Sequence, residues 1–305
     1  MTSDQKISIV IITYNRPDDM LELAKNIASL DHTHFLDEVV ILNNRSTQDY
    51  KSVEEFIATH PEIPFRYSIA GENLGVARGR NFAAEKTRAS ILVFIDDDAL
   101  FQNNDTLSQI QNIFSDIKNK DAGIVAFKIF YQSTMDFQQN AFPHKQLDER
   151  KDWHQFDTYY FSGCSHAIRR IVFEKAGYYP ENFFYGMEEY DLSYRTLNAG
   201  LKIMYDDRVT VLHKESPSGR LTNKEMLRGM WVNKTKVAWK HLPKKYFYST
   251  AILWSWQYLR KTGWNMGGFF KGWKEIFKIP KQEKRELLTK EALAYLKKVK
   301  ARLSY

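Results

Sequence analysis

Residues 91–98 have the sequence ILVFIDDD, in which five apolar residues are followed at once by three aspartates. Residues 7–13, ISIVIIT, are equally apolar and β-branched, and they lead into the polar cluster Thr13, Tyr14, Asn15 and Arg16. Continuous apolar runs of this length are typical of strands that are buried on both faces of a sheet. Ligands of open α/β sheets bind beyond the carboxyl ends of the strands. The two stretches therefore predict a buried sheet with a binding site at one edge.

The front part of the chain alternates between strand and helix patterns. Strands are predicted over 38–42 and 65–69, and helices over 17–30, 49–59 and 76–88. Beyond residue 120 the patterns indicate strands over 123–131 and 209–213, a loop region over 132–157 and a helix over 188–199. This succession predicts an α/β fold in which helices flank a mostly parallel sheet.

The chain changes character after Pro217. Residues 1–213 contain 22 Lys and Arg against 31 Asp and Glu, whereas residues 214–305 contain 22 against 6. Residues 222–305 show helical patterns throughout, and six of the seven tryptophans lie between 231 and 273. Such basic, aromatic helices either lie in an anionic membrane interface or use their tryptophans as a packing core. We expect a sheet domain over 1–215 and a helical C-terminal region over 216–305.

Composition excludes several classes of protein. The 305 residues are 43 % hydrophobic and 27 % charged, which allows a large core and excludes a disordered chain. Cys164 is the single cysteine, so an internal disulfide and a CxxC metal motif are excluded. Residues 1–6 lack a signal-peptide core, and the longest apolar-rich stretch, 246–259, is shorter than the ~20 residues of a membrane span. We expect a cytoplasmic protein without a transmembrane helix, and no nucleic-acid motif is present.

Two acidic clusters and one histidine are candidates for chemistry. Asp96, Asp97 and Asp98 are either a structural turn or ligands of a divalent cation, which binds carboxylates together with substrate phosphates. The acids Glu188, Glu189 and Asp191 begin a helix, where they either complement its dipole or supply a general base. His213 ends an apolar run, either as a structural residue or as the nitrogen ligand of a mixed site that suits Mn²⁺.

The polar residues at the strand ends suit a nucleotide. Tyr14 can lie against a base, and Asn43 can hydrogen-bond the edge of that base. Arg16, Arg78 and Arg80 carry planar guanidinium groups that match phosphate oxygens.

In their order along the chain, these segments resemble glycosyltransferase family 2, whose members have the GT-A fold with a Rossmann-like sheet. The resemblance covers roughly residues 6–215. It comprises SIVIITYNRP (8–17), VVILNNRST (39–47), ENLGVARGRN (72–81), FIDDDA (94–99), FSGCSHAIRR (161–170), GYYPENFFYGMEEYDLSYR (177–195) and VTVLH (209–213). It implies that residues 1–215 are the catalytic domain that binds a nucleotide sugar.

The resemblance also implies roles for individual residues. Asp96 and Asp98 match the DxD pair that holds Mg²⁺ or Mn²⁺, His213 would join the metal site, and Glu189 falls at the catalytic-base position. Glu188 or Asp191 can share or take the role of the base, because family members more often carry Asp where this chain has Glu189. The positions expected to contact the donor are Thr13, Tyr14, Asn15, Arg16, Asn43, Asn73, Gly75, Arg78, Arg80, Asn81, Asp96, Asp97 and Gly163.

The implied activity is the inverting, metal-dependent transfer of a sugar from a UDP-, dTDP- or GDP-sugar to a saccharide hydroxyl. By analogy with the family, the acceptor would be linked to polyprenyl diphosphate in a bacterial surface-polysaccharide pathway. The protein would then lie peripherally on the inner face of the membrane, through residues 222–305. Two alternatives are a nucleotidyltransferase and a catalytically silent scaffold that binds lipid or a partner.

Overall fold

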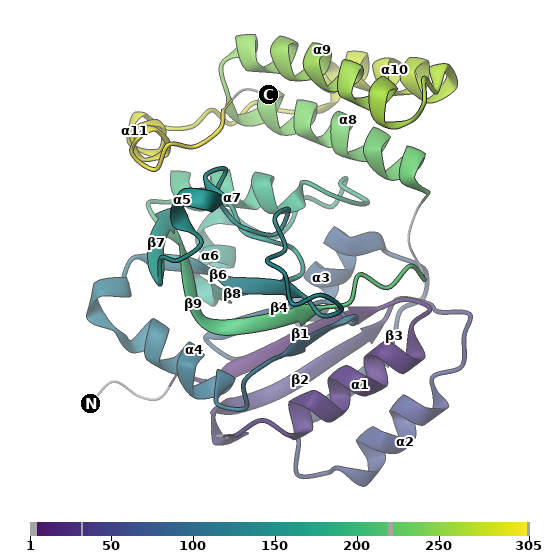
Figure 1. The fold of residues 1–305 in the computed structure, drawn as a ribbon, viewed down its shortest axis with the longest axis vertical. Coiled ribbons are helices and arrows are strands. Elements are labelled where there is room, and N and C mark those ends of the chain that lie inside the picture. Colours follow the sequence, from purple (N-terminus) through teal and green to yellow (C-terminus); the bar gives the residue numbers. More distant parts are fainter. Residues whose placement is uncertain (1–4, 32, 219–221, 304–305) are drawn as a thin grey trace.

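A computed structural model describes residues 5–31, 33–218 and 222–303, so parts of the segments 1–6 and 222–305 discussed above lie outside the described residues. Within that part of the chain, a sheet of nine strands is flanked by helices, and further helices form a layer above it (Figure 1). The strands are β1 (Ile7–Thr13), β2 (Leu36–Asn43), β3 (Phe65–Ile69), β4 (Ile91–Ile95), β5 (Ala99–Phe101), β6 (Ala122–Tyr131), β7 (Gln155–Thr158), β8 (Ser165–Arg169) and β9 (Lys202–His213). The strand order is β3-β2-β1-β4-β8-β6-β9-β5, and β7 pairs with β9.

The first four strands form the parallel half of the sheet. β1 pairs in parallel with both β2 and β4, and Thr13 lies opposite Asn43. All five residues of β4 are buried, as the apolar run predicts. The helices of this half are α1 (Pro17–Ala28), α2 (Lys51–Thr59) and α3 (Gly75–Glu85). The predicted parallel sheet is confirmed, and the carboxyl ends of β1, β2 and β4 meet at one edge.

The second half of the sheet is mixed. β8 is antiparallel to both β4 and β6, whereas β6 and β9 are parallel. The helices here are α4 (Thr106–Ser115), α5 (Leu147–Arg150), α6 (Arg170–Ala176) and α7 (Glu188–Asn198), with short 3₁₀ turns at Thr33–Phe35 and Ile117–Asn119.

Two expectations for this half are wrong. The region 132–157 is not loop throughout, because it contains α5 and the start of β7. β9 begins at Lys202 rather than at residue 209. Its first half contains charged residues that obscure the strand pattern: Asp206 is buried and pairs with Arg208 at 2.7 Å.

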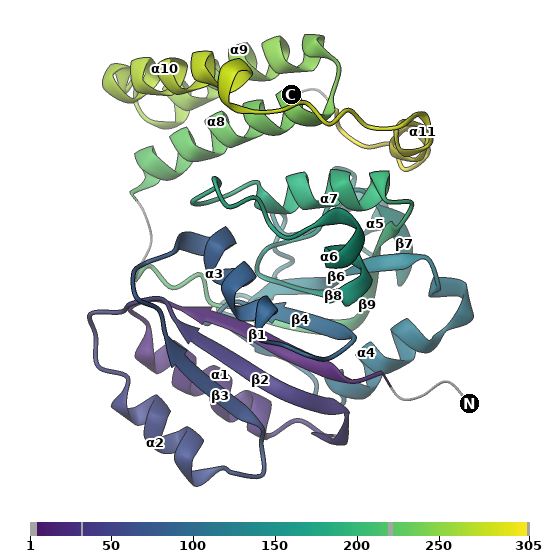
Figure 2. The same cartoon turned by 180° about the vertical axis from the view of Figure 1, so that it is seen from behind.

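The C-terminal region contains α8 (Asn223–His241), α9 (Lys244–Lys261), α10 (Met266–Gln282) and α11 (Lys290–Lys298). Residues 283–289 have no helical structure, so the region is not wholly helical as expected. α8 lies between the sheet domain and the pair α9–α10 (Figure 2). None of the described helices combines the length and the apolar character needed to cross a membrane.

The tryptophans of these helices divide into two sets. Trp231 is fully buried and donates from Nε1 to the carbonyl of Ala251 at 2.9 Å. It packs so closely on α10 that a Cβ atom on Gly272 would lie 2.3 Å from the ring. Trp256 and Trp264, by contrast, are 53 % and 57 % exposed. The packing-core interpretation is therefore correct for Trp231 and does not account for the exposed pair.

Asp191 of α7 connects the sheet domain to α8. Its carboxylate is fully buried and contacts Arg195 at 2.8 Å, His241 at 2.9 Å and Lys240. Burial alone would raise the pKa of Asp191, but the hydrogen bond from His241 and the charges of Arg195 and Lys240 lower it overall. The ionised carboxylate therefore stabilises the packing of α7 on α8.

Replacing Asp191 by Asn removes the charge that Arg195, Lys240 and His241 surround, so we expect a loss of about 3 kcal/mol in the free energy of unfolding at pH 7. Because the native pKa is depressed, the difference from wild type should be complete above the unfolded pKa of about 4 and shrink as the pH falls below it. Urea denaturation between pH 3 and pH 7 measures both effects. Glu55→Gln, at a carboxylate that is 66 % exposed in an ion pair with Lys51, is the control and should change stability by less than about 0.5 kcal/mol. Equal losses for the two variants would contradict the assignment.

Candidate active site

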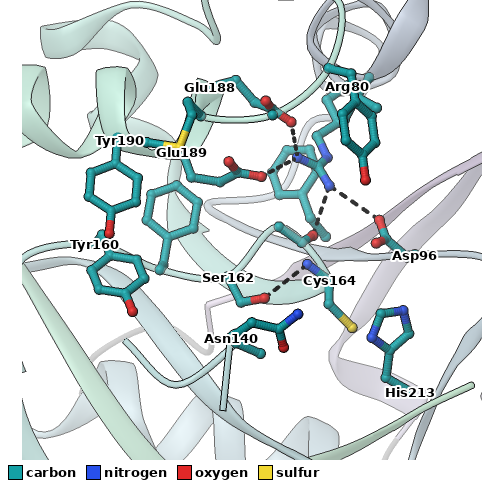
Figure 3. Close-up of a pocket in the computed structure, with 18 of the residues that line it drawn as sticks. Arg80, Asp96, Asn140, Tyr160, Ser162, Cys164, Glu188, Glu189, Tyr190 and His213 are labelled. Carbon is teal, nitrogen blue, oxygen red and sulfur yellow. Dashed lines mark hydrogen bonds and ion pairs between the residues drawn. The ribbon is translucent and has the colours of Figure 1, made fainter. Parts of the chain in front are cut away.

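A cavity of about 940 Å³ opens at the edge of the sheet where β1 and β4 end. Its floor comes from the residues after these strands, and its walls come from residues 159–164, the start of α7 and the α8 residues Met230 and Lys234. Figure 3 shows part of this wall, with Glu188, Glu189 and Tyr190 on one side and Asp96 and His213 on the other. Cavities of this size accommodate ligands of several hundred daltons.

The three aspartates after β4 point in different directions. Asp96 is 39 % exposed and faces the cavity, whereas Asp97 and Asp98 are buried. Arg16 contacts Asp97 at 2.7 Å and Asp98 at 3.1 Å, so its guanidinium offsets part of their mutual repulsion. Burial still raises the pKa of Asp97 to about 7, although Arg16 lowers it. One arginine does not balance this cluster.

His213, at the end of β9, lies beside these aspartates. The amide nitrogen of Gln138 donates to Glu215 at 2.8 Å, so the amide oxygen of Gln138 faces Nδ1 of His213 at 2.9 Å. Nδ1 must therefore carry a proton, because it faces an acceptor. The other ring nitrogen, Nε2, lies 3.3 Å from Asp98. Nε2 is buried, and no residue in the described part of the chain forms a hydrogen bond with it.

This environment suits a cation. Asp96, Cys164 and His213 each offer one ligand atom, and these atoms lie within 4.8 Å of one another. Burial lowers the pKa of His213, but the neighbouring Asp98 raises it, so this carboxylate favours a positive charge at Nε2. Asp96 and His213 offer an oxygen and a nitrogen atom of the kinds that bind Mn²⁺ or Mg²⁺, and Asp98 lies 3.3 Å from His213. Burial raises the pKa of the Cys164 thiol, which keeps it neutral.

Arg80 of α3 joins the two sides of the cavity. Its buried guanidinium contacts Asp96 at 3.2 Å, Glu188 at 3.3 Å and Glu189 at 3.1 Å, and it donates to the carbonyl of Gly163 at 2.8 Å (Figure 3). Burial lowers the pKa of this arginine, but the surrounding carboxylates raise it overall. Arg80 therefore fixes the position of Glu189 relative to Asp96.

The two glutamates at the start of α7 have different environments. Glu188 is buried, and none of the described residues forms a hydrogen bond with its Oε2 atom. Burial and the charge of Glu189 raise the pKa of Glu188 above its ordinary value, although Arg80 lowers it. The side chain of Glu189 is 14 % exposed and lies at the cavity wall.

The predicted site residues fall into two groups. The structure brings together at the cavity Tyr14, Arg16, Asn73, Gly75, Arg80, Asp96, Asp97, Asp98, Gly163, Glu188, Glu189 and His213. The predicted residues that do not line it are Thr13, Asn15, Asn43, Arg78, Asn81 and Asp191.

The second group makes local contacts instead. Asn43 accepts from the backbone of Ser46 at 2.8 Å and donates to Tyr67 at 2.7 Å. Asn15 accepts from the backbone of Thr47 at 2.8 Å. Thr13 bonds Tyr50, Arg78 pairs with Glu72, and Asn81 exchanges two hydrogen bonds with the backbone of Tyr179.

Several cavity residues were not predicted from the sequence. Tyr160 and Tyr190 stack with ring centroids 4.7 Å apart and an interplanar angle of 16°. Lys234 comes from α8, and Gln138 comes from the region expected to be loop. The tyrosines lie beside recognisable motifs, but no pattern in the sequence distinguishes them from core aromatics.

Comparison with known proteins agrees with this architecture. Residues 8–177 match the family model described as "Glycosyl transferase family 2". The chain is 32 % identical over 176 residues to an uncharacterised protein of Haemophilus influenzae, which corresponds to 57 % of this chain and 92 % of that protein. It is 25 % identical over 195 residues to the O-antigen chain rhamnosyltransferase WbaN of Salmonella anatum, which corresponds to 60 % of this chain and 58 % of that protein.

Among solved structures, the chain resembles the mannosyltransferase PcManGT of Pyrobaculum calidifontis. The TM-score is 0.60 at 18 % sequence identity, and the match covers 97 % of this chain and 80 % of the other. At this identity the likeness shows the fold alone.

Gly163 lies in the cavity wall, where its backbone is close to the side chain of Glu189. A Cβ atom there would lie 2.1 Å from Oε1 of Glu189, which Arg80 holds in place. We expect Gly163→Ala to displace Glu189 and to lower the free energy of unfolding by about 1–3 kcal/mol. Gly71→Ala is the matched control, because no atom lies within 4 Å of a Cβ at that position. Thermal or urea unfolding of both variants checks the prediction. Equal free energies of unfolding for the two variants would show that Glu189 can move aside without a loss of stability.

Proposed function

The chain belongs to glycosyltransferase family 2, and we propose that it is an inverting, metal-dependent enzyme that transfers a sugar from a nucleotide diphosphate donor to a saccharide hydroxyl. The observation that carries this proposal is a single cavity in which Arg80 holds Asp96 and Glu189 on opposite sides. We assign the catalytic domain to residues 1–215, with Met230 and Lys234 of the C-terminal region completing the cavity wall.

The donor diphosphate is assigned to the side of the cavity that holds the aspartates. Asp96, Asp98 and His213 would hold Mn²⁺ or Mg²⁺ there, and the bound cation would offset the charge that develops on the departing diphosphate. The structure of PcManGT in complex with GDP-Man and Mn²⁺ supports this assignment. Tyr14 and Arg16, at the end of β1, line the same side and are placed to contact the nucleotide.

Glu189 is the proposed general base. In the reaction it takes the proton from the acceptor hydroxyl, whose oxygen bonds to the anomeric carbon while the bond from that carbon to the diphosphate breaks. Attack from the face opposite the leaving group inverts the configuration. Glu188 is 2 % exposed, so it is less accessible to an acceptor than Glu189, whose side chain is 14 % exposed. Asp191 lies outside the cavity and is surrounded by Arg195, Lys240 and His241.

The acceptor is assigned to the side of the cavity with Glu189, Tyr160 and Tyr190. Stacked aromatic rings offer apolar faces against which sugar rings can pack. The similarity to an O-antigen chain rhamnosyltransferase supports a bacterial surface-polysaccharide pathway with a hexosyl or deoxyhexosyl donor. In such a pathway we propose a polyprenyl-diphosphate-linked saccharide as acceptor, used by a protein that lies peripherally on the inner face of the membrane.

The donor is identified by incubating the protein with Mn²⁺ and a panel of UDP-, dTDP- and GDP-sugars, and by measuring released nucleoside diphosphate with and without EDTA. We expect metal-dependent turnover of one donor. Glu189→Gln should lower transfer by about 10²-fold or more while donor binding persists, because only proton removal is lost. Asp98→Asn should abolish transfer through the metal site, and Glu55→Gln is the exposed control.

Three outcomes would contradict the proposal. Transfer by Glu189→Gln at the wild-type rate would move the base elsewhere. Release of pyrophosphate instead of a nucleoside diphosphate would indicate a nucleotidyltransferase. The absence of both turnover and a donor-induced thermal shift across the panel would favour a catalytically silent scaffold.

A further inference from the structure

Exposed apolar side chains are concentrated on α9, on α10 and on the turn between them. Of the fifteen large hydrophobic residues recorded as exposed in the described part of the chain, eight fall within residues 248–277. We call these eight the aromatic face: Tyr248, Ile252, Leu253, Trp256, Trp264, Met266, Phe270 and Phe277. Isolated exposed apolar residues need no explanation, but a contiguous set indicates an interaction surface.

Helical spacing makes this set contiguous. Tyr248, Ile252 and Trp256 are four residues apart, so they lie along one stripe of α9. Ala251 and Tyr258, which are buried, lie on a different side of the same helix. At the end of α9, the rings of Trp256 and Trp264 meet edge to face with centroids 5.5 Å apart, which connects the stripe to α10.

α10 continues the apolar surface and adds charge beside it. Met266, Phe270 and Phe277 lie on the exposed side of the helix, away from the buried Ile276 and Ile279. A row of exposed lysines follows the same helix at spacings of three and four residues: Lys271, Lys274, Lys278 and Lys281. Across residues 244–282 there are eight Lys and Arg and a single acid, Glu275.

We propose that α9 and α10 dock on an anionic lipid surface, with the aromatic face at the level of the headgroups and the lysines against lipid phosphates. Aromatic residues beside a lysine row are the signature of helices that lie in a membrane interface. A second copy of the chain fits this surface less well than lipid does. Lysine is depleted at protein interfaces, and two such faces would bring like charges together.

The position of this surface relates it to the cavity. Figures 1 and 2 show α9 and α10 on the far side of α8 from the sheet. Lys234 of α8 lines the cavity, and its Nζ lies 4.3 Å from the ring centroid of Trp254 on α9. Docking would therefore bring the cavity within one helix layer of the lipid, which suits a lipid-carried acceptor. This last point rests on the proposed function, whereas the docking itself does not.

The test is co-sedimentation of the full chain with vesicles of phosphatidylcholine alone, or of phosphatidylcholine mixed with phosphatidylglycerol. We expect binding to the anionic vesicles to be at least ~10-fold tighter, and to weaken with salt. Two variants separate the contributions of the surface: Ile252→Ser/Trp256→Ser/Phe270→Ser removes apolar side chains, and Lys271→Gln/Lys274→Gln/Lys278→Gln removes charge. Each should lower the binding by about tenfold or more.

Ile117→Ser/Met135→Ser is the matched control, because both side chains are at least half exposed and lie far from α9 and α10 in sequence. It should bind vesicles as the wild type does. Circular dichroism and thermal melts establish that each variant is folded. Donor hydrolysis without vesicles should be unchanged in the two α9–α10 variants, which distinguishes a failure of docking from a failure of the proposed enzyme activity.

Equal binding to both kinds of vesicle, or unchanged binding by either α9–α10 variant, would overturn the proposal. A second result would also overturn it: the wild type forms a dimer in light scattering and does not bind vesicles, and the apolar variant is a monomer. The aromatic face would then be a contact between two copies of the chain.

Discussion

The buried guanidinium of Arg80 is the interaction on which the site depends. A buried cation is tolerated only where carboxylates and carbonyl oxygens surround it, and Arg80 has three carboxylates and the carbonyl of Gly163. These partners come from the residue that follows β4, from the segment before β8 and from α7, which are far apart in the sequence. The same contact that satisfies the arginine therefore sets the spacing between the aspartates and Glu189. With three acids around one cation, burial and the charge of Glu189 still raise the pKa of Glu188.

A second set of buried charges attaches the helical layer to this arrangement. Asp191 lies two residues after Glu189 on α7, and its cations Lys240 and His241 end α8. The orientation of α7, and hence of Glu189, depends in this way on contacts made outside the sheet domain. The division of the chain near residue 215 follows a change in composition, but the cavity includes side chains from both parts.

The sequence predicts the parallel half of the sheet well, because β1 and β4 are continuous apolar runs with polar ends. It predicts the second half poorly. β8 has the sequence SHAIR, and β9 begins with KIMYDDR. Both contain polar or charged residues that make contacts within the fold, so neither shows the apolar pattern by which a buried strand is predicted. Within the site, the resemblance to a family identifies the acids. It places Glu189 at the catalytic-base position but leaves Glu188 and Asp191 as alternatives, because the three acids differ in burial and partners: Glu188 is buried beside Arg80, Glu189 faces the cavity, and Asp191 contacts Lys240 and His241 of α8. Gln138, which orients His213, carries no local signal.

The link between Asp191 and the end of α8 also orders events during synthesis of the chain. When residues 1–215 have been made, every acid of the cavity is present in the chain, but Lys240 and His241, which contact Asp191, are not. The contacts that attach α7 to α8 can therefore form only after the last residue of α8 has been added.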